Sequence, residues 1–216
     1  MTVNNTAGTK TFTKFIIQNN GTWTSTAAET YTITDSLILK NAIINGTAIG
    51  VFTVTKSLWV TEGPSDIGAA TLTINQNTVL DNTLNINSTS GNKTFTDVII
   101  NASGALVCSV NESFVIRGNL TNNGTITAGT GTYTFNGSSK TISGTNPITL
   151  GAVSITGTIT NVGTLYVSGA LSGTGSLTND TDSYLRITRN NTITTLIATS
   201  LNNTVEYDYT STQTIK

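Results

Sequence analysis

The sequence predicts an all-β protein, a right-handed parallel β-helix whose coils are about 20 residues long. Three observations predict this solenoid. The composition favours strands, short runs alternate apolar and hydroxyl side chains, and those runs recur at a nearly constant interval.

The polar part of the composition is unusual. Thr, Asn and Ser occupy 91 of the 216 positions. β-Branched Thr fits a pleated surface, whereas Asn and Ser compete with a helix for backbone hydrogen bonds. The apolar residues are spread along the whole chain in short alternating runs, which is typical of half-buried strands and not of a disordered tract.

The charge excludes two classes of partner. The formal net charge is −1, and nucleic acids or anionic lipids attract clustered Lys and Arg. No run approaches the ~18 apolar residues of a membrane span. We therefore expect no nucleic-acid partner and no membrane span.

Strand-like runs follow one another at intervals of about 20 residues. In order they are Phe12–Ile17, Tyr31–Leu39, Val51–Val60, Ala70–Ile74, Phe95–Ile100, Phe114–Leu120, Tyr133–Phe135 and Ala152–Ile155. Pairs such as Asn20-Gly21 and Asn136-Gly137 separate the runs, and these residues tolerate the left-handed backbone of a tight corner. The best helix candidate, Ser57–Glu62, is too short, so every element is expected to be a strand.

An internal duplication pairs residues 10–39 with residues 93–122, at an offset of 83 residues. It places Lys10 on Lys93 and Glu29 on Glu112. We interpret residues 1–216 as one continuous solenoid. The alternative is two tandem antiparallel β-sandwiches of about 100 residues each. Repeats of one coil's length inside the duplicated unit favour the solenoid, because a sandwich does not need them.

The sequence offers little catalytic chemistry. It has no His and one Cys, which excludes the common zinc sites and the Ser–His and Cys–His nucleophile systems. We predict no enzymatic activity and no cofactor, and a buried, unreactive Cys108. Glu206 and Asp208 share a strand face, and Arg186 and Arg189 lie about one coil earlier, which suggests an exposed ion-pair ladder.

Asp180 and Asp182 form the one candidate metal site. Alternating acidic residues in a turn supply oxygen ligands to calcium in some proteins. The segment lacks the glycine and the later glutamate of the helical calcium loop, and it lacks the repeat of calcium-binding solenoids. A plain polar turn is the alternative interpretation.

Thr-x-Thr triplets suggest a further alternative, an ice-binding solenoid face. They include those that begin at residues 11, 22, 32, 53, 71, 94, 125, 132, 158 and 192. An ice-binding array needs one triplet per coil in register. The gaps range from 7 to 34 residues, so we expect these threonines only to fill outward strand positions.

Two residue types suggest contacts with sugars. Trp59 and Trp23 are candidate stacking platforms, although the apolar phase of Trp23 favours the core. Asn-x-Ser/Thr sequons predict surface glycans. They include Asn20, Asn45, Asn101, Asn119, Asn136 and Asn202.

The segment from Tyr133 to Leu177 resembles the repeat tracts of very large secreted surface proteins in Bacteroidetes-type bacteria. The segment from Asn203 to Lys216 looks similar, and that from Asn4 to Phe12 resembles a degenerate copy. The resemblance implies an extracellular, often filamentous or adhesive protein. It supplies no catalytic residues to carry over.

These observations favour a non-enzymatic structural or adhesive segment of an extracellular cell-surface protein or filament. Met1-Thr2-Val3 opens no signal peptide, and both ends cut the repeat in mid-unit, so we interpret the chain as a fragment. Open ladder edges predict end-to-end self-association. The alternatives are a carbohydrate-binding or carbohydrate-cleaving β-helix, and an ice-binding solenoid.

Overall fold

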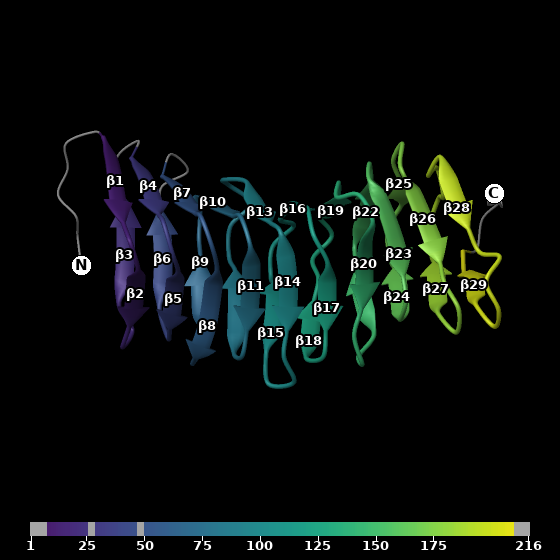
Figure 1. The fold of residues 1–216 in the computed structure, drawn as a ribbon, viewed down its shortest axis with the longest axis horizontal. Helices are drawn as coiled ribbons and strands as arrows, with labels where there is room; N and C mark the ends of the chain where they lie inside the picture. Colours follow the sequence, from purple (N-terminus) through teal and green to yellow (C-terminus); the bar gives the residue numbers. More distant parts are fainter. Residues whose placement is uncertain (1–7, 26–28, 47–49, 210–216) are drawn as a thin grey trace.

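The computed structural model describes residues 8–25, 29–46 and 50–209. Throughout these ranges the strands pair in parallel and no helix occurs. The coils stand side by side along the long axis of the molecule, with β1 and β29 at opposite ends (Figure 1). The predicted parallel β-solenoid is therefore confirmed, and the alternative of two antiparallel sandwiches is wrong.

Each complete coil contributes three strands, one to each of three faces. Face 1 contains β1 (Thr9–Phe12), β4 (Thr30–Ile33), β7 (Val51–Val54), β10 (Thr71–Ile74), β13 (Lys93–Phe95), β16 (Phe114–Ile116), β19 (Thr132–Phe135), β22 (Ala152–Ile155) and β25 (Leu171–Ser172). Face 2 contains β2 (Phe15–Gln18), β5 (Leu37–Lys40), β8 (Leu58–Glu62), β11 (Asn77–Leu80), β14 (Asp97–Ile100), β17 (Leu120–Asn122), β20 (Lys140–Ser143), β23 (Thr158–Asn161), β26 (Ser176–Asn179) and β28 (Thr195–Ile197).

Face 3 consists of two sheets. The first contains β3 (Thr22–Ser25), β6 (Ile43–Gly46), β9 (Ser65–Ile67), β12 (Thr83–Ile86), β15 (Ala105–Cys108) and β18 (Thr125–Thr127). The second contains β21 (Ile148–Leu150), β24 (Thr164–Val167), β27 (Tyr184–Ile187) and β29 (Thr204–Tyr207). The strands of faces 1 and 2 form one sheet each, so the coils stack continuously on two sides of the molecule.

The coil length varies while the register is kept. Partners in adjacent coils lie from 17 residues apart, as Ile148 and Leu165 do, to 23 apart, as Ile43 and Asp66 do. The 83-residue duplication spans four coils, because Lys10 lies in β1 and Lys93 in β13. Loops at the corners absorb most of the differences in length, and one bulge in the ladder between β5 and β8 shifts the register between Leu39 and Lys40.

Alternation places one side of every strand in the core. Ile33 and Leu37 are fully buried, and their column neighbours are also apolar. At the first coils the core is aromatic: the Trp23 ring lies 4.7 Å from that of Phe15 and 4.9 Å from that of Tyr31. The expectation that Trp23 packs in the core is confirmed.

The corners refine the predicted elements. The run Phe12–Ile17 forms two strands, β1 and β2, with a corner between them. Asn20, Asn41 and Gly63 have φ of 59°, 50° and 57° and stack at the corner between faces 2 and 3. The left-handed backbone expected at Asn20 is confirmed.

Other corner glycines serve a different purpose. A Cβ at Gly137 would lie 2.0 Å from the carbonyl oxygen of Arg117, and one at Gly104 would lie 2.0 Å from that of Leu80. Their φ values are not left-handed. These glycines are required because the neighbouring coil approaches too closely for a side chain.

Candidate functional surfaces

A buried ion pair joins two coils inside the solenoid. The Lys93 Nζ lies 3.6 Å from the Glu112 Oε1, with side-chain exposures of 0% and 3%. The same ammonium donates to the carbonyl oxygens of Ser90 at 2.9 Å and Gly91 at 2.7 Å. Burial lowers the pKa of Lys93 and raises that of Glu112, while their mutual attraction opposes both shifts.

The duplication repeats this pair four coils earlier. The Lys10 Nζ lies 2.5 Å from the Glu29 Oε1, and the Tyr31 hydroxyl donates to the other oxygen of Glu29. Lys10 is 22% exposed, unlike its buried equivalent. The alignment matched the residues but did not predict that they pair. The signal was the shared spacing of 19 residues between Lys and Glu in both copies.

Cys108 and Tyr133 lie in the same part of the core. Both are about 1–2% exposed. Burial raises the pKa of Cys108 to about 11 and also raises that of Tyr133. The thiol is therefore protonated at neutral pH, and the predicted burial of Cys108 is confirmed.

The calcium candidates lie in the turn between β26 and β27. The Asp180 Oδ1 accepts from the Thr181 amide at 2.8 Å and from the Ser200 hydroxyl at 3.1 Å. The Asp182 Oδ1 accepts from the Asn202 amide at 3.0 Å, and the φ of Asp182 is 56°. These bonds give both carboxylates a role in the turn, and calcium binding there stays a prediction.

An exposed ion-pair ladder runs across the end of face 3. Arg186 in β27 pairs with Asp208 and lies 3.6 Å from the Glu206 Oε2. The Tyr184 hydroxyl also donates to Glu206, and this bond raises the pKa of Tyr184. The predicted ladder is confirmed for Arg186.

Other described carboxylates form contacts between neighbouring coils. Three bond to an Asn amide of the next coil, in the pairs Asp66–Asn85 at 2.7 Å, Asp81–Asn101 at 2.5 Å and Asp97–Asn119 at 3.1 Å. In the described ranges, no three His, Cys, Asp or Glu side chains gather where they would hold a metal ion. No described helix is long and apolar enough to cross a membrane.

Threonines form an in-register column at the outward positions of face 1, where Thr94 alone is buried, at 8% exposure. Its members are Thr11, Thr32, Thr53, Thr73, Thr94, Val115, Thr134, Ser154 and Ser172, each the Cα partner of the next. The expectation that these threonines fill outward strand positions is confirmed at Thr11, Thr32 and Thr53, and one row of this face is in addition in register. The triplets at residues 22, 125 and 158 lie in β3, β18 and β23, on other faces. Unequal coil lengths account for the remaining irregularity.

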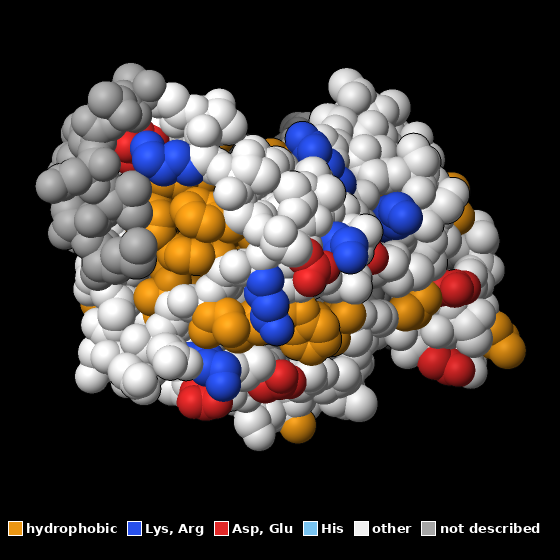
Figure 2. Space-filling model, turned by 60° about the vertical axis from the view of Figure 1, so that its left-hand side comes forward, with side chains coloured by type: hydrophobic (Ala, Val, Ile, Leu, Met, Phe, Trp, Pro, Cys, Tyr) orange, Lys and Arg blue, Asp and Glu red, His pale blue; other side chains and the backbone are white. Residues whose placement is uncertain are grey.

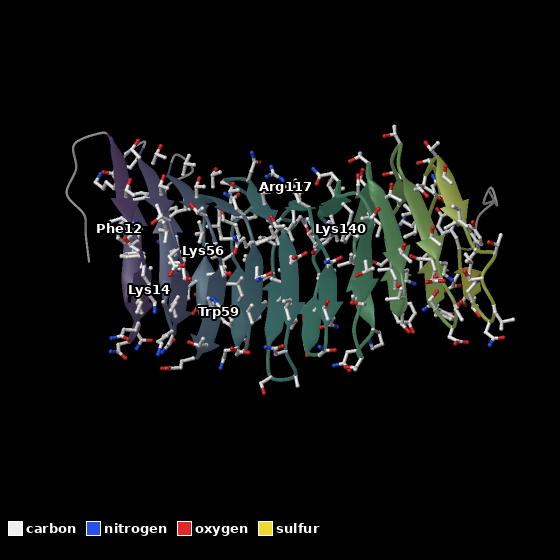
Figure 3. All side chains as sticks on the ribbon, in the orientation of Figure 1. Phe12, Lys14, Lys56, Trp59, Arg117 and Lys140 are labelled. Atoms are coloured by element: carbon white, nitrogen blue, oxygen red, sulfur yellow. The ribbon has the colours of Figure 1, made fainter. Side chains whose placement is uncertain are left out.

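Trp59 and the asparagines of the sequons differ in how far they are exposed to solvent. Trp59 is 37% exposed on face 2, where Figure 3 labels it. Asn20, Asn45 and Asn136 are exposed, which a glycan requires. Asn202 is also exposed, and its side-chain amide donates to Asp182. Asn101 and Asn119 are partly buried, and their side-chain amides donate to Asp81 and Asp97.

The fold and its surfaces define a parallel β-solenoid with a hydroxyl-rich exterior. No family model, curated protein or solved structure matches the chain.

Proposed function

We propose that the chain is a non-enzymatic structural or adhesive segment of an extracellular cell-surface protein or filament. The observation that carries this proposal is the continuity of the ladders. Faces 1 and 2 connect nine and ten strands. At the ends of these sheets β1, β2 and β28 pair with a described strand on one side only, whereas β25 also forms a parallel bridge from Leu171 to Asn191. The resemblance to secreted surface repeats supports the same role.

A mechanical role follows from how the coils are held. Most neighbouring coils are bonded through three short parallel strand pairs, and a common core runs along the axis. Between the coils of β18 and β21, faces 1 and 2 alone supply strand pairs. A force applied along the axis acts on the strand pairs between every two successive coils, so each coil transmits the whole force to the next. The outward hydroxyls limit nonspecific hydrophobic association between rods.

Electron microscopy of the purified chain at increasing concentration tests the proposal. Rods that lengthen by whole multiples of the monomer would identify the open ladders as assembly surfaces. Rods that stay separate, together with binding of a glycan or cell surface, would support the adhesive role. Hydrolysis of a polysaccharide by the purified chain would contradict the proposal.

The threonine column favours ice binding as a second candidate function. Parallel strands lie about 4.8 Å apart, and alternate residues of a strand lie about 6.6 Å apart. These spacings approximate repeats of the oxygen lattice of ice. In the column itself, eight of nine positions carry a hydroxyl and none is charged.

Thermal hysteresis of a dilute solution tests this candidate. Thr53→Lys would interrupt the middle of the column and abolish the effect, whereas Thr160→Lys on face 2 would leave it intact. A wild-type protein without thermal hysteresis, or two variants with equal activity, would rule out ice binding by face 1.

A further inference from the structure

An apolar column crosses the first five coils on the outside of face 2. Its members, which we call the apolar stripe, are Ile16, Ile38, Trp59, Val79 and Ile99, each the Cα partner of the next. Ile16 is 46% exposed and Trp59 is 37% exposed, Ile38 and Ile99 are partly exposed, and Val79 in the fourth coil is only 7% exposed. A contiguous apolar patch bordered by polar residues marks an interaction surface.

The stripe ends within the face. At the next two coils its positions are taken by Thr121 and Ser143. The parallel pairing of face 2 continues unchanged where the outward side chains change from apolar to hydroxyl. The fold itself therefore does not require apolar side chains in the stripe. The first five coils therefore carry a surface that the later coils lack.

Charged side chains border the stripe on both sides at coils two and three. Before the strands, the Lys56 Nζ lies 2.9 Å from the Asp35 Oδ1; after them, the Lys40 Nζ lies 2.7 Å from the Glu62 Oε1. All four side chains are 31% to 65% exposed. Figure 2 shows apolar side chains with charged side chains close beside them on this part of the molecule.

The positive and negative charges of these two pairs follow one another in opposite order along the solenoid. From coil two to coil three the charge changes from Asp35 to Lys56 on one border and from Lys40 to Glu62 on the other. If two copies faced each other across a twofold axis parallel to the long axis, the stripe of one copy would lie on the stripe of the other. The border before the strands in one copy would then lie on the border after the strands in the other. Asp35 would then face Lys40 of the second copy, and Lys56 would face its Glu62.

Each contact would complete a ring of four alternating charges. Two of its ion pairs exist within each chain, and two would form between the copies. A twofold axis perpendicular to the long axis that overlaps the whole stripe passes through coil three, and it would place Lys56 on Lys56 and Glu62 on Glu62. Shifting that axis between coils two and three would pair Asp35 with Lys56, but it would leave Ile99 outside the overlap. Full overlap of the stripe together with the charge pattern therefore favours the parallel arrangement.

We propose that the apolar stripe is a lateral docking surface for a second copy of this chain, with the two solenoids side by side and parallel. The stripe and its borders cover roughly 25 by 20 Å, which is about 500 Å² per copy. This area lies at the low end of specific interfaces, so the dimer is expected at micromolar concentrations. The contact adds to the proposed structural role and does not depend on association of the ends.

Sedimentation velocity across a micromolar concentration series tests the apolar part. Ile38→Lys would weaken the dimer at least about tenfold, because it buries a charge opposite the second stripe. Ile197→Lys is the matched control, since Ile197 is a 39% exposed outward residue of face 2 outside the stripe. Circular dichroism establishes that both variants fold. A monomeric wild type, or equal weakening by both variants, would overturn the proposal.

A mixing experiment tests the charged part with two exposed substitutions that leave the core intact. Lys56→Glu alone and Glu62→Lys alone would each place like charges across the contact and abolish the dimer. An equimolar mixture restores opposite charges at both positions and would recover a one-to-one heterodimer. A mixture that stays monomeric contradicts the arrangement. Electron microscopy separates this result from end-to-end assembly, because lateral pairing doubles the width of a rod and end contacts increase its length.

Discussion

The buried pair of Lys93 and Glu112 offers the sharpest test of the packing. Lys93→Met keeps an unbranched side chain, one heavy atom shorter, and removes its charge. Glu112 is then left in the core without its partner, and its Oε2 already lacks a hydrogen bond. Breaking a buried pair on one side costs about 3–5 kcal/mol.

This loss is large enough to measure by thermal unfolding at pH 7. For a chain of this size, 1 kcal/mol shifts Tm by about 2–4 °C, so Lys93→Met would lower Tm by roughly 6–20 °C. The double variant Lys93→Met/Glu112→Leu would recover most of the loss, because no charge remains buried.

The duplicated pair provides an internal control. Lys10→Met would lower Tm by less, because Lys10 is 22% exposed and Glu29 keeps its bond to Tyr31. The pH dependence has a definite sign. Burial raises the pKa of Glu112 above its ordinary value of 4.5, so the folded protein favours the protonated carboxyl. The free energy of unfolding therefore falls as pH rises above 4.5, and the loss of stability caused by Lys93→Met is smaller in acid. A Lys93→Met variant that melts like the wild type, or a double variant as unstable as the single, would refute this account.

Three further predictions concern other regions. Ile33→Asp would place an unpaired carboxylate in a fully buried column and abolish cooperative melting of the N-terminal coils; hydrogen exchange with unchanged protection there would contradict the packing. Burial raises the pKa of Cys108 from 9.0 to about 11. Between these pH values the free energy of unfolding of the wild type would therefore fall by up to about 2.7 kcal/mol relative to that of Cys108→Ala. If the stabilities of the two proteins changed equally with pH, the thiol would not be buried. Arg186→Met would leave Tm nearly unchanged because its pairs with Glu206 and Asp208 are exposed, and a large drop in Tm would show that this ladder is structural.

Local sequence patterns were sufficient for the class of fold. Alternation in runs such as Val51–Val60 specifies which side chains enter the core, and the recurrence of these runs specifies stacking. The same alternation predicted that Cys108 and Trp23 are buried, because period two depends only on the neighbouring residues. The polar strands of face 3, such as Thr22–Ser25, escaped detection because they carry few apolar residues.

Contacts between coils required the tertiary structure. Lys93 and Glu112 are 19 residues apart, and whether they meet depends on the length of each corner. The threonine column was obscured for the same reason, since unequal loops make regular rows irregular in sequence.

The sequence by itself therefore determined that this protein is a parallel solenoid with an apolar interior and a hydroxyl-rich exterior, because strand alternation is a local property. Only the tertiary structure decided that threonines line face 1, that the apolar stripe lies on face 2, and that two Lys–Glu pairs join adjacent coils. These features depend on the register between coils, which backbone hydrogen bonds and corner lengths set together.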